Sequence, residues 1–199
     1  MEKETGRIEA FSDGVFAIAI TLLVLELIIP AQENLDNSSL LMLLKKHWPS
    51  YLAFTTSFFS ILIMWMNHHE MFRHIHTVTR PVIFANGLLL LLVTAVPFPT
   101  SLIAQYIQTP AANMAAAVYS GTFVVINISF NLLWYTATKN GCLKKGVDIK
   151  TINEFKGLYL IGLPAYLAAF VVAFFHAGLS IMICMVLWLY WTFTIKLNK

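Results

Sequence analysis

Hydrophobic positions dominate this chain in long unbroken runs rather than in alternation. A run of about 20 apolar residues is the length that a helix needs to cross a hydrocarbon core of roughly 30 Å. Within a bilayer only helices and closed barrels satisfy every backbone polar group, and barrel strands alternate apolar with polar positions. The runs therefore predict an all-α membrane protein with six spans, at residues 8–30, 47–71, 81–107, 111–138, 155–176 and 178–196.

Prolines interrupt two of these predicted spans. Pro97 and Pro99, in the sequence VPFPTS, lack a backbone donor and clash with the preceding turn, so we expect them to kink or end the outer half of the third span. Pro164 should bend the fifth span for the same reason. The connections between spans are short, which predicts a single six-span domain over residues 1–199.

Composition agrees with a membrane location. The 199 residues are 58% hydrophobic and 12% charged, with a mean hydropathy of +0.72. A soluble domain of this composition would expose too much apolar surface to water. Cys142 lies in a lysine-rich loop and Cys184 lies inside the last span, so we expect no disulfide. The first apolar run contains Asp13 and has no signal-peptide cleavage pattern, so we expect a retained span.

Lysine and arginine residues indicate the orientation of the chain. Of the 13 such residues, only Lys45 and Lys46 fall on one side of the predicted membrane, and the rest fall on the other. The positive-inside rule then places both termini in the cytoplasm, which requires an even number of spans. These residues also account for the net charge of +3, so we expect no nucleic-acid partner.

The first predicted span contains the sequence RIEAFSDGVFAIAITLLVLEL, residues 7–27, and carries one continuous aliphatic stripe. On a helical wheel of about 100° per residue, Phe11, Leu22 and Leu25 all fall within roughly 40° of Ile18. This stripe must face surroundings different from those of the polar residues on the same helix.

Ser12 and Asp13 are those polar residues, and they lie about 120° and 220° from Ile18 on the same wheel. A carboxylate inside a membrane helix costs about 2.5–3.5 kcal/mol on insertion scales, so it normally faces protein or water. Asp13 is then either a cation or proton site or a hydrogen-bond hub, and we favour the hub. Its candidate partners at a similar depth are Trp65, His68, His69 and Asn86.

The histidine-rich sequence NHHEMFRHIH at the end of the second span suggests metal binding at first sight. His69 and His76 share a helix face and Glu70 is adjacent, but His47 and His176 lie far from them in the predicted topology. A metal site needs several such ligands from at least two helices. We therefore expect no metal site, and without a phosphate loop, nucleophile elbow or HExxH motif we expect no enzyme.

Two questions stay open at this stage. Glu26, near the outer end of the first span, is either solvated or lends negative potential to an outer vestibule. A secondary transporter, with a substrate site inside one six-helix subunit, is the alternative class of protein. Against it, nothing like the sequence FSDG of the first half recurs in the second, as an inverted repeat would require.

The pattern Arg7-x-x-x-Phe11-Ser12-Asp13 before an aliphatic span resembles the RxxxFSD signature of the transmembrane protein 175 family of lysosomal potassium channels. The sequences WMNHHEMFR and LLLLVTAVPFPTSL also resemble the pattern of that family. A single six-span repeat is similar to the prokaryotic branch, whose members assemble as tetramers.

This resemblance implies a homotetramer in which four copies of the first span surround a central pore. Ile18 then resembles the aliphatic constriction of the family, and Leu22 and Leu25 continue the lining outward. Thr21 matches a hydroxyl position implicated in ion selectivity. The helical wheel reaches the same stripe separately from the resemblance.

The resemblance also implies that the signature residues Arg7, Phe11, Ser12 and Asp13 form a network that holds the first span. Arg7 would otherwise repel cations at the inner mouth. We therefore expect a potassium-permeable leak channel with modest selectivity over sodium, no cofactor, and lipid and monovalent cations as its partners. The short single-repeat chain indicates the plasma membrane of a prokaryote.

Overall fold

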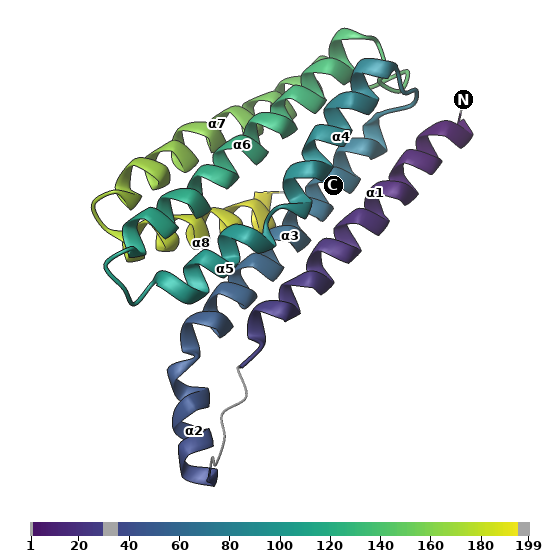
Figure 1. Cartoon of the computed structure of the whole chain (residues 1–199). Coiled ribbons are helices and arrows are strands. Elements are labelled where there is room, and N and C mark those ends of the chain that lie inside the picture. Colours follow the sequence, from purple (N-terminus) through teal and green to yellow (C-terminus); the bar gives the residue numbers. More distant parts are fainter. Residues whose placement is uncertain (1, 30–35, 195–199) are drawn as a thin grey trace.

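The computed structural model describes residues 2–29 and 36–194, and these residues form helices joined by short connections (Figure 1). The last residue of the first predicted span and residues 195–196 of the sixth lie outside the described residues. The elements are α1 (Glu2–Leu22), the 3-10 helix η1 (Leu23–Leu27), α2 (Asn37–Lys46), α3 (Trp48–His74), α4 (Arg80–Thr94), α5 (Pro97–Tyr106), α6 (Ala112–Lys139), α7 (Ile149–Ala173) and α8 (Ala177–Thr194).

Five helical stretches among the described residues are long and apolar enough to cross a membrane. The sixth predicted span corresponds to α8, which is shorter but apolar over Ala177–Phe193. The all-helical membrane architecture is thereby confirmed, whereas the number of six spans stays a prediction. The five stretches are Thr5–Leu27, Trp48–His74, Arg80–Tyr106, Ala112–Lys139 and Ile149–Ala173.

The third predicted span breaks where its prolines predict a break. Helix α4 ends at Thr94, and α5 starts at Pro97, which occupies its first turn, where a missing backbone N–H is tolerated. By contrast, α7 continues as a helix through Pro164, so the predicted bend there stays a prediction. The first span also changes character, because its α-helix tightens into a 3-10 helix from Leu23 onward.

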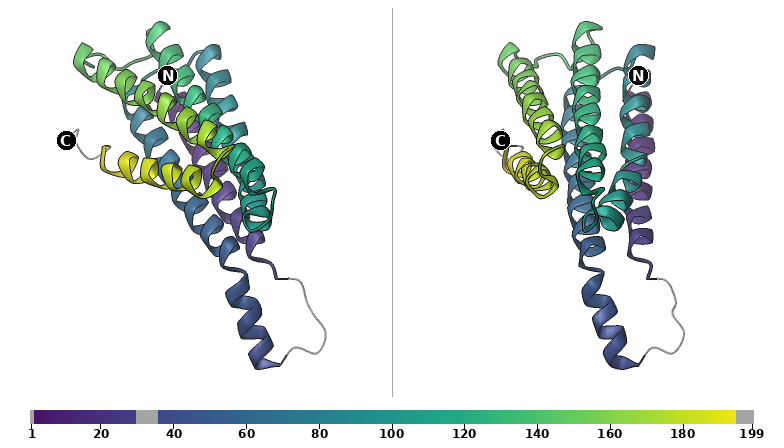
Figure 2. Two further views of the ribbon diagram at one scale, coloured as in Figure 1. Left: turned by 90° about the vertical axis from the view of Figure 1, so that its left-hand side faces the viewer. Right: turned by 60° about the vertical axis from the view of Figure 1, so that its left-hand side comes forward.

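Helix α2 was not expected from the sequence, which indicated only a connection between the first two spans. The Asp36 carboxylate caps it by accepting a hydrogen bond of 2.8 Å from the backbone N–H of Ser39. Hydrogen bonds from Ser39 lower the pKa of Asp36 below its ordinary value. Figure 2 shows α2 extending beyond the bundle, and none of its residues is buried. At ten residues α2 is too short to span a membrane, so the search for long apolar runs did not find it.

Helix α1 lies at the edge of the bundle, where it packs against α3 and α4 (Figure 1). On the far side of α3, the long pair α6 and α7 and the oblique α8 form the rest of the core (Figure 2). Helix α6 is central to this part, because it contacts α4, α5, α7 and α8.

The loops at one end of the bundle are tied together and to α1. The backbone N–H of His76 donates to the Cys142 carbonyl at 2.8 Å, and that of Lys144 donates to the His74 carbonyl at 2.9 Å. The Thr5 hydroxyl of α1 donates to the His76 carbonyl at 2.9 Å. Cys142 and Cys184 are both buried and free, in agreement with the expected lack of a disulfide.

Helices α6, α7 and α8 pack too closely at Gly162 for a larger residue. A Cβ atom there would lie 2.6 Å from Asn127 Nδ2 and 2.7 Å from Trp191 Cζ2. We predict that Gly162→Ala lowers the free energy of unfolding by about 1–3 kcal/mol, the usual effect of overpacking. Thermal unfolding of the purified protein in detergent measures this. Gly157→Ala is the matched control on the same helix, because its Cβ would meet nothing within 4 Å, and equal stability of the two variants would contradict the packing.

Candidate functional site

One face of α1 and η1 is built into the bundle. Ser12, Phe16, Ala19 and Leu23 are all buried, and they recur at intervals of three and four residues. This spacing puts them on a single stripe that faces α3 and α4. The small Ala19 and the polar Ser12 allow close approach at two of the four positions.

The other face of the same helix is uncovered within the subunit. Ile18, predicted as the constriction, is 58% exposed, and Phe11, Leu22 and Leu25 are exposed along with it. The Thr21 side chain is exposed on this side too, and its hydroxyl donates to the Ile18 carbonyl at 2.8 Å. An aliphatic stripe of the length of the span is therefore free to contact lipid, water or another subunit.

Ser12 is the start of a buried hydrogen-bond chain that joins three helices. Its hydroxyl donates to the Ile8 carbonyl at 2.8 Å and accepts from Asn86 Nδ2 of α4 at 3.0 Å. Asn86 Oδ1 lies 2.8 Å from His68 Nε2 of α3. The side chains of Ser12, Asn86 and His68 are all buried, so it would be costly to leave any of them without a hydrogen-bond partner.

Aromatic rings hold His68 in place. Its ring lies 4.4 Å from that of Phe72, in a stacked arrangement, and 5.4 Å from that of Phe16 on α1. Phe16 follows Ser12 by four residues and therefore lies on the same helix face. Sequence reasoning did not identify Phe16 or Phe72 as parts of the site, although the spacing of Phe16 from Ser12 was a usable signal.

Asp13 has a separate anchor. Trp65 Nε1 of α3 donates to Asp13 Oδ1 at 2.7 Å, and the indole stacks on His69 with ring centroids 6.0 Å apart. Asp13 itself is exposed within the subunit. Of the candidate partners, Trp65 bonds to Asp13 and Asn86 bonds to Ser12, while His68 bonds to Asn86. Neighbouring residues on a helix point about 100° apart, which separates the two anchors.

Two signature residues lie outside these anchors. Arg7 and Phe11 are exposed, and Arg7 makes no hydrogen bond or ion pair with the described part of the chain. Arg7 instead lines an open groove of about 390 Å³ together with Arg80. Their predicted participation in the network stays a prediction.

Glu26 and Glu70 occupy different ends of the molecule. Glu26 is partly buried and, at the end of η1, lines a cavity of about 530 Å³ with Lys46, His47 and Gln105. Glu70 pairs on its own helix with Arg73 at 2.9 Å and with His74 at 3.5 Å. Both roles considered for Glu26 stay open, because the cavity admits solvent and carries charge.

The fold and the site together define a polytopic α-helical membrane protein whose first helix is anchored on one face and bare on the other. The family model described as endosomal/lysosomal potassium channel TMEM175 matches residues 7–97. This segment contains the residues that hold Ser12 and Asp13 in place, namely Trp65, His68 and Asn86. The comparisons with whole proteins extend the similarity to nearly the full chain.

A potassium channel of Chamaesiphon minutus is 48% identical over 190 residues, which cover 95% of this chain and 94% of that protein. A potassium channel of Streptomyces collinus is 40% identical and covers 96% of this chain. A crystal structure described as a lysosomal potassium-selective channel TMEM175 homolog from Chamaesiphon minutus has a TM-score of 0.89 at 46% identity, covering 98% of this chain and 99% of that one. The chain belongs to the TMEM175 family of ion channels, which confirms the expectation that it is not an enzyme.

Asn86 is the central residue of this hydrogen-bonded group, because it bonds to Ser12 on one side and to His68 on the other. We predict that Asn86→Leu lowers the free energy of unfolding by about 2–4 kcal/mol, because it leaves the buried Ser12 and His68 without their partner. Thermal unfolding in detergent measures the change. Asn153→Leu, at an exposed position of α7, is the control and should have little effect. A result in which both variants are equally stable would show that the chain from Ser12 to His68 does not hold α1.

Proposed function

We propose that this protein is a potassium-permeable cation channel in which α1 of four identical subunits surrounds the pore. The observation that carries the proposal is the two-sided helix, with Ser12 and Phe16 buried in the bundle and Ile18, Leu22 and Leu25 uncovered. The relatives named potassium channels, which cover nearly the whole chain, support the same function. Potassium and other monovalent cations are the permeant species, and no cofactor takes part.

The constriction works without charges or carbonyls at its narrowest point. A ring of Ile18 side chains excludes water when it is narrow and, when slightly wider, makes a cation shed part of its hydration shell with little compensation. Potassium is less strongly hydrated than sodium, so it loses less. The resulting preference for potassium is real but modest. Thr21 donates its proton to Ile18, which leaves the oxygen lone pairs of its hydroxyl available to a passing cation.

The two anchors set the rotation of α1 about its own axis. Asn86 holds Ser12 from α4, and Trp65 holds Asp13 from α3, so the helix is gripped from two directions. A rotation that moved Ile18 off the pore axis would break both hydrogen bonds. The signature thus acts as a positioning device, and the aliphatic stripe forms the conduction surface.

The distribution of basic residues supports the proposed orientation. The loops after α3 and α6 meet at the end where α1 begins, and most of the lysines and arginines lie there. By the positive-inside rule this end is cytoplasmic. With α8 as a sixth span both termini are cytoplasmic, and the membrane is the plasma membrane of the cell.

We predict that Ile18→Asn raises sodium permeability relative to potassium several-fold, because an amide replaces lost hydration for either ion. Potassium and sodium flux into liposomes containing the purified protein measures this. Ile161→Asn is a matched control, because Ile161 on α7 is also 58% exposed but lies away from α1. An unchanged ion preference in Ile18→Asn would show that Ile18 does not form the constriction.

Substitutions at Asp13 distinguish an anchor from an ion site. Asp13→Asn keeps an acceptor for Trp65 Nε1, whereas Asp13→Ala leaves the indole without it. We predict a lower yield of tetramer for Asp13→Ala than for Asp13→Asn, measured by mass analysis of the purified protein. If both variants assemble normally and both change the conductance, the carboxylate serves ions directly.

A further inference from the structure

Arg7 and Arg80 carry positive charges and line the same open groove of about 390 Å³ between α1 and the start of α4. Neither side chain makes a hydrogen bond or an ion pair with the part of the chain that the structure describes. Glu9, the acidic residue that follows Arg7 most closely, lies about 200° around the helix from it. By contrast, Arg73 at the same end of the bundle pairs with Glu70 at 2.9 Å. The described residues thus give the two guanidinium groups of the groove no counter-charge.

Hydrogen bonds between α1 and its neighbours set the two arginines at the same level. The Thr5 hydroxyl donates to the His76 carbonyl at 2.9 Å, close to the start of both helices. Further along both, Asn86 Nδ2 donates to the Ser12 hydroxyl at 3.0 Å, so α1 and α4 run in the same direction. The arginine of α1 precedes Ser12 by five residues and that of α4 precedes Asn86 by six, which is about 7.5 and 9 Å along the two helices. Packed helices have axes about 8–10 Å apart, so two arginine side chains at one level can reach the same group.

The two helices also present similar side chains beyond the arginines. The sequences RIEAFSDG, residues 7–14, and RPVIFANG, residues 80–87, share arginine, phenylalanine and glycine at the same intervals. Phe11 and Phe84 each follow an arginine by four residues, so they lie on the same helix face one turn further along. They are 66% and 79% exposed. Each helix therefore presents a cation and then an uncovered aromatic ring along one side.

The rest of the groove is aliphatic. Ile8, Val78 and Ile83 complete its lining, and Ile83 is 47% exposed. Helix α4 begins at Arg80, and the Thr79 side chain does not cap it, so the positive end of the helix dipole adds to the charge of the groove. A ligand that fits this lining combines a negative group with an apolar part.

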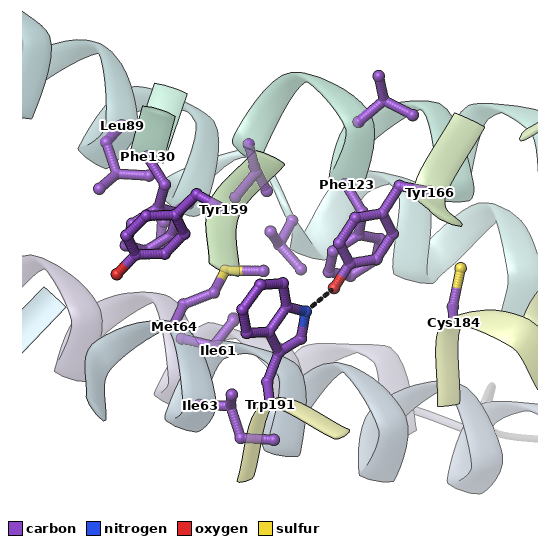
Figure 3. Close-up of a cluster of buried hydrophobic side chains, with 14 of the residues drawn as sticks. Ile61, Ile63, Met64, Leu89, Phe123, Phe130, Tyr159, Tyr166, Cys184 and Trp191 are labelled. Atoms are coloured by element: carbon purple, nitrogen blue, oxygen red, sulfur yellow. Dashed lines mark hydrogen bonds between the residues drawn. The ribbon is translucent and has the colours of Figure 1, made fainter. Parts of the chain in front are cut away.

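The aromatic core on the other side of α3 has no space for such a ligand. Its cavity between α3, α6, α7 and α8 has a volume of about 40 Å³. Figure 3 shows the rings that fill this region, those of Phe123, Phe130, Tyr159, Tyr166 and Trp191. A cavity that binds benzene has about 150 Å³, so this one excludes a lipid or a solute of similar size. The groove, by contrast, falls within the range of about 300–1,000 Å³ that is usual for small-molecule sites.

We propose that the groove of Arg7 and Arg80 is a binding site for an anionic phospholipid of the leaflet at this end of the bundle. The two guanidinium groups bind the phosphate, because arginine presents paired N–H donors that match phosphate oxygens. The glycerol and the first acyl carbons lie on Ile8, Val78 and Ile83. Basic pockets between membrane helices bind anionic head groups in this way.

A lipid matches the groove better than a water-soluble anion does. Free phosphate would pair with the arginines but would leave the aliphatic lining and the rings of Phe11 and Phe84 uncovered. A phospholipid covers both parts at once, and the bilayer supplies it. The inference uses only the groove and its membrane surroundings, so it does not depend on the proposed conduction path, and its test measures binding rather than flux.

Native mass spectrometry of the purified protein, titrated with phosphatidylglycerol in detergent, tests the site. Arg7→Gln and Arg80→Gln should each weaken binding about fivefold, and the double variant about 25-fold. Both arginines are exposed and unpaired among the described residues, so an unchanged melting temperature without lipid checks that the variants fold. The matched control is the double variant Lys144→Gln and Lys145→Gln, which removes the same charge at the same end of the bundle but outside the groove, and it should bind as tightly as the unmodified protein.

Two further ligands test the kind of occupant on the unmodified protein, without relying on a variant. Phosphatidylcholine with the same acyl chains and glycerol phosphate without any should both bind more weakly than phosphatidylglycerol. Equal binding of the two lipids would show that the groove does not select negative charge, and glycerol phosphate bound as tightly as the lipid would identify a soluble anion. Either result overturns the proposal. It is also overturned if the arginine and lysine variants lose binding equally, or if the arginine variants lose none.

Discussion

The pairing of Ser12 with Asn86 is the interaction on which the rest of the site depends. A serine and an asparagine placed inside membrane helices are costly alone, and each becomes favourable only when the other is in register. His68 extends the pair into α3, and Phe16 and Phe72 close it off on both sides. Because the groups are buried, partial pairing is worse than none, so α1 has one preferred rotation.

That rotation gives a single helix two unlike surfaces. The inner surface contributes packing and hydrogen bonds, and the outer surface contributes nothing to the stability of one subunit. In water such an exposed aliphatic stripe would drive aggregation, but in a bilayer it is neutral toward lipid and free to meet other copies of itself. The architecture therefore places the buried, hydrogen-bonded face of α1 and its uncovered aliphatic face about half a helical turn apart.

Particular elements show how far the sequence could go. Long apolar runs located five helical stretches, and Pro97 marked the break between α4 and α5, because chain length in a bilayer and a missing N–H act locally. The aliphatic stripe of α1 followed from helical periodicity alone. Helix α2 was not predicted, because it is too short to cross a membrane and the search was for long apolar runs.

The sequence by itself therefore determined that this protein lies in a membrane and where its spans approximately fall. It also determined that one helix has an aliphatic face and an adjacent polar pair. Only the tertiary structure decided which groups satisfy that pair. Asn86 lies 74 positions from Ser12, and Trp65 lies 52 positions from Asp13. Periodicity along one helix reports which face a residue occupies, but the partner on another helix depends on how the two helices are rotated and offset when they pack.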